Sequence, residues 1–372
     1  MDRSFDLIVI GAGIVGLAHA LSGVRRGLRV GVFERDARAN GASTRNFGLV
    51  AVTGQRSADT WRRAHRTRDV WNEIAPLAGI RILQRGLLMA VRRPEALAVI
   101  EEFAAGPMGK DCRVLGPAQL PEPLRARPLL AALHSPHELR VDSREALPRL
   151  AAWMASAHGV RFHWGTAVRD VAAGGIETAR GAYTAPWIVV CPGTDVSTLF
   201  PTSFERRSVG LCKLHMLRLA DPGWRLPSAV MSDLGLERYA GYASCPSLPS
   251  LRERLRLEQR AELDNGVHLI VTQDDDGSLV VGDSHHHGSV ADPFQPRHVD
   301  ALILREAQCV LDLPRPEVLE RWVGHYPYGS QDAFVEVPLP GVRLVSVTSG
   351  TGASTAFGLA QEVIDELGSS EP

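Results

Sequence analysis

Several side chains of this sequence have the chemistry needed to hold a small anion. Arg45 and Asn46 lie in the polar loop "GASTRNFG", and Lys213 stands in the strand-like segment "GLCKLHML" among alternating apolar residues. A half-buried lysine is costly unless it is paired or used, and arginine binds carboxylates and phosphates through parallel hydrogen bonds. We therefore take these residues as candidate contacts of a substrate or cofactor. The plainer alternative is an exposed loop arginine and a lysine on the solvent face of an edge strand.

A run of three histidines is the second candidate group. Consecutive side chains on an extended chain point to alternate sides, so His285, His286 and His287 cannot all bind one metal ion. We predict no metal, and we expect one or two of them, His286 and His287 first, to donate to an anionic substrate. Satisfied polar loop residues are the alternative. Tyr326 is a candidate cap of the same cleft, with packing as its alternative.

The chain opens with a strand, a turn, a helix and a second strand, which could position these groups. The apolar run 5–10 is typical of a parallel strand buried on both faces. A helix over 14–26 and a strand over 28–33 follow. The turn between the first strand and the helix carries the G-x-G-x-x-G spacing, at Gly11, Gly13 and Gly16. These glycines permit a tight turn, close approach of the backbone to a pyrophosphate, and packing of helix against strand.

The second strand ends at Glu34, 23 residues after Gly11. An acidic side chain at this place accepts hydrogen bonds from the ribose hydroxyls of an adenine dinucleotide and disfavours the 2′-phosphate of NADP. The polar loop that follows does not continue as a further strand–helix unit, which favours a flavin over a nicotinamide cofactor.

Later segments are predicted to return to this first unit. We expect a helix over 142–158, strands over 160–164, 167–171 and 188–191, and a final strand over 342–348 with a helix over 354–367. A second glycine turn, Gly350-Thr351-Gly352, opens that last helix.

These motifs resemble the flavin amine oxidoreductases of the D-amino-acid oxidase, glycine oxidase and sarcosine oxidase superfamily over nearly the whole chain. The resemblance rests on the N-terminal glycine turn with Glu34-Arg35, on "GVRFHWGTAVRDV", on "VVCPGTD" and on "SGTGASTAFGLA". It implies FAD as the cofactor, with Val168 at the adenine, Gly193 near the pyrophosphate and Gly350 to Gly352 at the isoalloxazine. The full predicted FAD set is Gly11, Gly13, Ile14, Val15, Gly16, Glu34, Arg35, Ser43, Thr44, Arg45, Val168, Gly193, Gly350, Thr351, Gly352 and Ser354.

Some members of this superfamily hold FAD covalently through a Cys or a His. Residues 321–352 contain no Cys and residues 41–48 contain no His, so we predict non-covalent FAD. "GASTRNFG" and "GDSHHHG…DPF" further resemble a subgroup associated with aminophosphonate catabolism. That resemblance implies a small anionic amine, such as 2-aminoethylphosphonate or an N-alkyl or hydroxy relative, oxidised to an aldehyde, with O2 or a quinone as electron acceptor.

Three alternatives stay open: an oxidase or dehydrogenase of glycine, sarcosine or D-amino acids, an FAD-dependent hydroxylase, and a non-catalytic flavoprotein subunit. The predicted fold is a two-domain α/β (α+β) one, D-amino-acid oxidase-like. Residues 1–50, 140–205 and 325–372 would form a discontinuous Rossmann-type FAD domain. Residues 51–139 and 206–324 would form a substrate domain around an antiparallel sheet.

Composition limits the partners. The net charge of −1 is not that of a nucleic-acid binder, and no apolar run approaches the roughly 20 residues of a membrane span. Five scattered cysteines without metal or disulfide spacing favour a reducing, cytoplasmic compartment.

Overall fold

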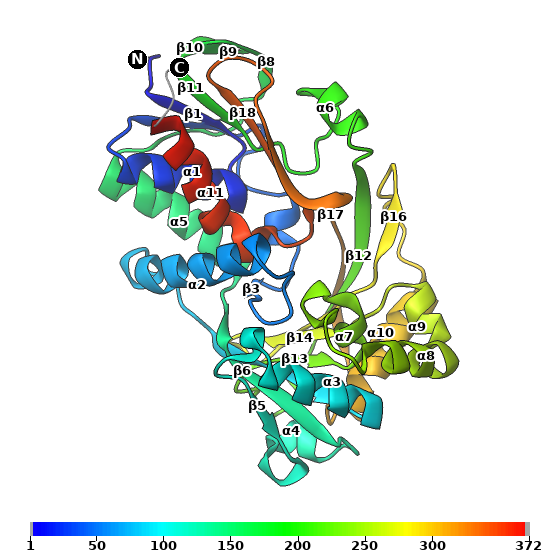
Figure 1. Cartoon of the computed structure of the whole chain (residues 1–372). Helices are drawn as coiled ribbons and strands as arrows, with labels where there is room; N and C mark the ends of the chain where they lie inside the picture. The colour runs from blue at the N-terminus through cyan, green and yellow to red at the C-terminus, as the bar shows by residue number, and fades with distance from the viewer. Residues whose placement is uncertain (1–2, 369–372) are drawn as a thin grey trace.

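The computed structural model describes residues 3–368 and contains one large mixed sheet and a small antiparallel sheet (Figure 1). One end of the large sheet consists of parallel strands, because their short apolar runs are buried on both faces. In spatial order these strands are β18 (Val342–Ser349), β11 (Trp187–Val190), β1 (Leu7–Ile10), β2 (Val30–Phe33) and β7 (Arg161–His163).

Four helices share a hydrophobic core with one face of these parallel strands, and they lie together in Figure 1. They are α1 (Ile14–Arg25), α2 (Asp59–Leu77), α5 (Ser143–His158) and α11 (Gly352–Gly368). Helix α5 begins where the Asp142 side chain accepts a hydrogen bond from the Arg144 N–H and ends at left-handed Gly159. Over the other face, a separate core joins the strands to the small sheet of β8 (Val168–Ala172), β9 (Gly175–Thr178) and β10 (Gly181–Thr184).

The remainder of the large sheet is mainly antiparallel and has its own core. Its strands are, in spatial order, β3 (Leu49–Val50), β6 (Ala131–Arg140), β4 (Gln84–Val91), β13 (Ala229–Ser232), β14 (Ile270–Gln273), β15 (Leu279–Gly282), β12 (Gly210–Leu219) and β17 (Val318–Glu336), with β5 (Arg113–Leu115) beside β6 and β16 (His286–Gly288) beside β12. Within this part β4 and β13 run parallel.

Shorter elements surround this antiparallel part and the links to it. The helices are α3 (Pro94–Ala105), α4 (Glu122–Arg125), α6 (Pro201–Glu205), α7 (Leu234–Arg238), α8 (Leu248–Glu258), α9 (Arg260–Asp264) and α10 (Arg297–Val310). The 3₁₀ turns are η1 (Ala42–Thr44), η2 (Pro107–Gly109), η3 (Pro117–Gln119) and η4 (Ala240–Tyr242).

Strand β17 joins the two halves. Its first part pairs with β12, up to Tyr328 opposite Gly210, and its last part pairs with β18, up to Glu336 opposite Leu344. The predicted two-part architecture, with a parallel and an antiparallel portion, is confirmed. The predicted domain limits stay predictions, and the one at residue 325 lies inside this continuous strand. Within residues 3–368, no helix combines the length and the apolar character that a membrane crossing requires.

Candidate active site

A cavity of about 300 Å³ lies between the parallel and antiparallel halves. On one side it is lined by the turn after β1, the turn after β11 and the start of α11. On the other side it is lined by the end of α7, the segments before β14 and after β15, and β17. The predicted site residues that line it are Gly13, Ile14, Val15, Gly16, Ser43, Arg45, Asn46, Gly193, Tyr326, Gly350, Thr351, Gly352 and Ser354.

The turn after β1 contains a close backbone approach that requires glycine at Gly16. A Cβ on Gly16 would lie 1.8 Å from the Gly11 carbonyl oxygen, and one on Gly13 would lie 3.1 Å from Ser43 Oγ. Ser43 Oγ accepts a hydrogen bond from the Ile14 N–H at 2.9 Å, and no side chain caps the helix at Gly13. The start of α1 lines the cavity, where helix N-terminal backbone can approach a pyrophosphate.

Glu34 ends β2 directly behind this turn. Its carboxylate oxygens accept hydrogen bonds from the Ala12 N–H at 2.8 Å and the Asp36 N–H at 3.0 Å. The neighbouring Arg35 pairs with Asp195 at 2.7 Å, which ties the end of β2 to the turn after β11. Glu34 and Arg35 do not line the cavity, and neither do Gly11, Thr44 and Val168. Their roles toward FAD therefore stay predictions.

The second glycine turn lies between β18 and α11. Gly350 has φ +76°, and a Cβ there would lie 2.9 Å from the Tyr326 ring, so glycine is required on both counts. Ser354, in the first turn of α11, accepts a hydrogen bond from the Ala51 N–H at 2.9 Å. The N-terminus of α11 thus faces the cavity, where its dipole favours negative charge.

The opposite wall carries charged side chains that the sequence analysis did not select. Arg238 ends α7, and its Nη2 donates to Tyr326 Oη at 3.3 Å. Among the described residues, no carboxylate lies within ion-pair distance of this guanidinium, although Asp283 also lines the cavity. Arg238 was missed because it is one of 39 arginines and stands in no motif.

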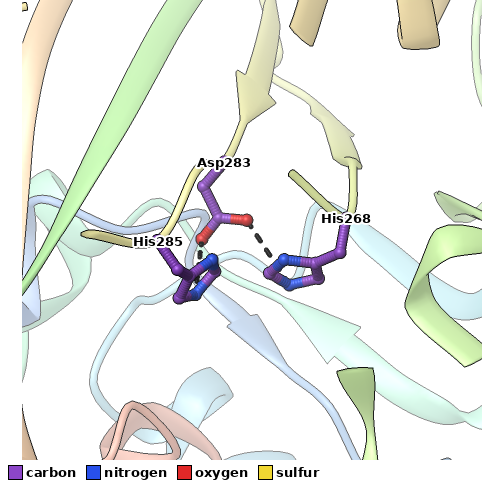
Figure 2. A group of neighbouring side chains, drawn as sticks. All are labelled: His268, Asp283 and His285. Atoms are coloured by element: carbon purple, nitrogen blue, oxygen red, sulfur yellow. Dashed lines mark ion pairs between the residues drawn. The ribbon is translucent and has the colours of Figure 1, made fainter. Parts of the chain in front are cut away.

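Asp283 lies between two imidazole rings (Figure 2). One carboxylate oxygen is 3.4 Å from His268 Nε2 and the other is 3.8 Å from His285 Nε2, and all three side chains are nearly buried. Burial raises the pKa of Asp283 to about 7, against the opposing charge of Arg238. Burial also lowers the pKa of His268 to about 3 and that of His285 well below its usual value.

Three of the predicted substrate contacts do not line the cavity. On β12 successive side chains alternate, so Leu214 lines the cavity while the Lys213 ammonium pairs with Asp292 at 2.7 Å and donates to the Phe294 carbonyl. His286 follows the same face, with its ring 5.4 Å from that of His215. His287 instead stacks on the Tyr328 ring at 3.8 Å. Lys213, His286 and His287 were expected to contact substrate, but the structure places all three outside the cavity lining.

The predicted loop residues are at the cavity but are partly engaged. The Asn46 side chain donates to the carbonyls of Ala42 and Ser43 and accepts from the Gly48 N–H, so it holds the loop in shape. Arg45 donates through Nε to the Asn40 carbonyl at 3.0 Å. Among the described residues, the Arg45 guanidinium has no other hydrogen-bond partner and no carboxylate partner.

The residues that line the cavity suit the pyrophosphate and the reactive ring of a dinucleotide. Two glycine turns and two helix N-termini supply backbone for phosphates and for a ring edge that gains negative charge. The facing wall supplies a guanidinium, a buried carboxyl and a tyrosine hydroxyl. We call the side with Gly13 to Gly16 and Gly350 to Ser354 the cofactor wall, and the side with Arg238, His268, Asp283 and Tyr326 the polar wall. A cofactor wall that faces a polar wall suits redox chemistry on a small charged molecule.

Comparisons with known proteins agree with this geometry. The sequence model of the family described as "FAD dependent oxidoreductase" matches residues 6–366. A comparison with curated protein sequences finds no match.

Similar solved structures cover almost the whole chain. Glycine oxidase from Geobacillus kaustophilus is 17% identical, with a TM-score of 0.78, covering 100% of this chain and 96% of that one. L-proline dehydrogenase from P. horikoshii is 16% identical, with a TM-score of 0.80 and coverage of 100% and 95%. Iminodiacetate oxidase from Chelativorans sp. BNC1 is 20% identical, with a TM-score of 0.74 and coverage of 98% and 96%. At these identities the likeness establishes the fold.

Proposed function

The chain belongs to the FAD-dependent oxidoreductase family, and from that premise we propose that it oxidises the carbon–nitrogen bond of a small anionic amine. The cofactor is FAD, held non-covalently. Bound FAD would supply an acceptor for a hydride from the carbon next to the amine nitrogen, and water would hydrolyse the resulting imine to an aldehyde. The protein's own part is to bind the anionic end, orient the amine and exclude water.

The observation that carries this proposal is the Arg238 guanidinium on the cavity wall. A guanidinium keeps its charge at any physiological pH and is costly to enclose without an anion. Among the described residues, its one hydrogen-bond partner is the neutral Tyr326 hydroxyl, and no carboxylate pairs with it. An anionic substrate group would complete that pairing, and Tyr326 Oη could add a further hydrogen bond.

We further propose an aminophosphonate, such as 2-aminoethylphosphonate or an N-alkyl or hydroxy relative, as the substrate. The resemblance of "GASTRNFG" and "GDSHHHG…DPF" to the aminophosphonate subgroup supports it, as does the excess of positive charge in the cavity. Arg56 is neutralised by Asp332 at 3.0 Å, whereas Arg45 and Arg238 have no carboxylate partner among the described residues. A phosphonate carries more charge than a carboxylate and could engage both.

Oxidation of glycine, sarcosine or a D-amino acid is the second candidate. Its support is the similarity of the fold to a glycine oxidase and an iminodiacetate oxidase, whose names give amino-acid substrates. A single carboxylate would need only Arg238.

An anaerobic titration of the purified holoenzyme separates the candidates. The flavin absorbance is followed while 2-aminoethylphosphonate, its N-methyl derivative, glycine, sarcosine and D-alanine are added in turn. We expect bleaching by the phosphonates alone. Bleaching by the amino acids alone would favour the second candidate, and no bleaching by any of them would contradict amine oxidation. Reoxidation of the bleached protein by air or by a soluble quinone then identifies the electron acceptor.

A further inference from the structure

We propose that Asp283, held between His268 and His285, accepts the proton of the substrate's ammonium group before the carbon–nitrogen bond is oxidised. This role rests on the proposed amine oxidation and adds a catalytic residue to it. The need is chemical, because a hydride leaves readily only from a carbon whose nitrogen has a free electron pair. Simple amines are protonated at neutral pH, as the usual pKa of about 10.4 for lysine illustrates. A group in the cavity that takes up that proton would allow the ammonium form, which predominates in solution, to react.

Asp283 lines the cavity, and one of its carboxylate oxygens has no hydrogen-bond partner. His285 Nδ1 lies 3.0 Å from the Gly266 carbonyl, which can only accept, so Nδ1 carries the hydrogen. In the neutral ring, the Nε2 that faces Asp283 then has a lone pair. Asp283 Oδ1 has no hydrogen-bond partner although it is buried, and it lies on the side of His268. The carboxyl is thus positioned by the two rings and retains capacity for a ligand.

The surroundings of Asp283 make it a base that works near neutral pH. Burial raises its pKa to about 7, which brings the carboxyl closer to an amine in proton affinity than an exposed aspartate would be. The groups that face it from the neighbouring elements are Arg238 from α7, Tyr239 after α7, Cys212 from β12, Tyr326 from β17, His268 before β14 and His285 after β15.

Of these groups only Arg238 is charged at neutral pH. Burial raises the pKa of both tyrosine hydroxyls and raises the pKa of Cys212 to about 11, while it lowers the pKa of both histidines. The polar wall therefore presents one fixed cation and one titrating carboxyl. A zwitterion that places its anionic end at Arg238 has its ammonium near Asp283.

The proton step balances without any further reactant. The N–H bond of the ammonium breaks, its electron pair stays on nitrogen, and the proton bonds to a carboxylate oxygen of Asp283. The products are a neutral amine and a neutral carboxylic acid, so no net charge is created in the cavity. After the imine has formed and left, the acid returns its proton to water.

The same three side chains offer two imidazoles and a carboxylate within 4.8 Å of one another, a donor set that a divalent cation also uses. The uncompensated Arg238 charge on the same wall opposes a cation there, and it favours a substrate that carries both charges. A stoichiometric metal in the purified protein would overturn the assignment of Asp283 as a base.

The test is the pH dependence of anaerobic flavin bleaching in the holoenzyme, with whichever amine of the panel bleaches fastest. In the wild type, the limiting rate should fall as the pH drops below about 7, because Asp283 becomes protonated. In Asp283→Asn, the rate at pH 7 should fall by about 10²–10⁴-fold. It should then recover toward about pH 10, where the free amine loses its own proton. Asp283→Glu keeps a carboxylate and should retain more of the rate at neutral pH.

The matched control is Asp264→Asn, which removes an exposed carboxylate paired with Arg260 and should keep the wild-type profile. A wild-type pH profile in Asp283→Asn, or a loss that is uniform at every pH, would overturn the role of Asp283 and leave amine oxidation standing. If Asp283→Asn does not fold, a wild-type rate that is flat between pH 5.5 and 8.5 would overturn it equally. Absence of bleaching by every amine would instead overturn the proposed function, and this role with it.

Discussion

The two walls of the cavity are built in different ways. The cofactor wall is made by backbone, and each of its parts is a few consecutive residues, such as Gly13 to Gly16 or Gly350 to Ser354. The facing wall is made by side chains from separate segments, with Arg238, His268, Asp283 and Tyr326 spread over nearly ninety residues. A local motif can therefore specify the first wall, whereas only the folded sheet assembles the second.

The largest effect is expected where the cofactor wall admits no side chain. Gly16→Val would place a Cβ 1.8 Å from the Gly11 carbonyl oxygen, and neither backbone atom can move without separating α1 from β1. We expect a protein that folds poorly or lacks FAD. The ratio of flavin to protein absorbance and the melting temperature measure this.

Gly41→Ala is the matched control for that change. A Cβ on Gly41 would meet nothing within 4 Å, and the backbone there has a negative φ that alanine also adopts. Its FAD content and melting temperature should equal those of the wild type. Full FAD content in Gly16→Val would contradict the close approach of the turn to α1.

The second prediction concerns the polar wall and should separate substrate binding from cofactor binding. Arg238→Met keeps much of the side-chain volume but removes the charge, so FAD should stay bound while flavin bleaching by the substrate weakens about 10²-fold or more. Stopped-flow bleaching at a series of amine concentrations measures it. Arg225→Met, which removes an exposed arginine paired with Asp221, should leave the rates unchanged. An unchanged bleaching rate in Arg238→Met would contradict the proposed anion site.

The sequence predicts the cofactor wall well because its determinants are local. The strand over 5–10, the glycine turn and Glu34 follow from apolar runs and spacing, and the structure has β1, α1 and β2 within two residues of the expected bounds. The last strand and helix were predicted from the second glycine turn in the same way. In both places the motif specifies the backbone conformation, and backbone is what a bound dinucleotide would contact there.

The polar wall could not be predicted from local patterns because it depends on which face of a strand a residue occupies. Lys213 and Leu214 are neighbours in "GLCKLHML", yet alternation along β12 sends only Leu214 to the cavity. The histidine run is the more conspicuous pattern, yet Asp283, three residues before His286, is the side chain of this segment that lines the cavity. A buried aspartate after an apolar strand was the available signal.

The third prediction tests whether the polar wall costs stability. The folded Asp283 keeps its proton up to about pH 7, whereas in the unfolded chain it loses it near pH 4. The native state therefore binds more protons in between, and its stability falls as the pH rises from about 4 to 7. Asp283→Asn removes that loss, on the order of a few kcal/mol at most.

The melting temperature of Asp283→Asn minus that of the wild type should therefore be larger at pH 7.5 than at pH 4.5, by a few degrees. An asparagine amide can also donate to His285 Nε2, so packing is preserved. The lowered pKa of His268 destabilises the native state toward acid pH in both proteins and largely cancels in the difference. A difference in melting temperature that does not change with pH would contradict a neutral Asp283 at acid pH.

The smallest effect is expected at Lys213, which follows Cys212 and precedes the cavity-lining Leu214 but lies on the other face of β12 from Leu214. Lys213→Met removes the pair with Asp292, whose carboxylate is more than half exposed, so we expect a loss of about 1 kcal/mol or less. Flavin bleaching should stay within a few-fold of the wild type, because the ammonium points away from the cavity. Asp292→Asn breaks the same pair from the other side and should also leave flavin bleaching within a few-fold of the wild type, but it leaves the nearly buried ammonium without its carboxylate and should cost more stability. A bleaching rate in Lys213→Met as low as that of Arg238→Met would place Lys213 in the reaction and contradict the division between the two faces of β12.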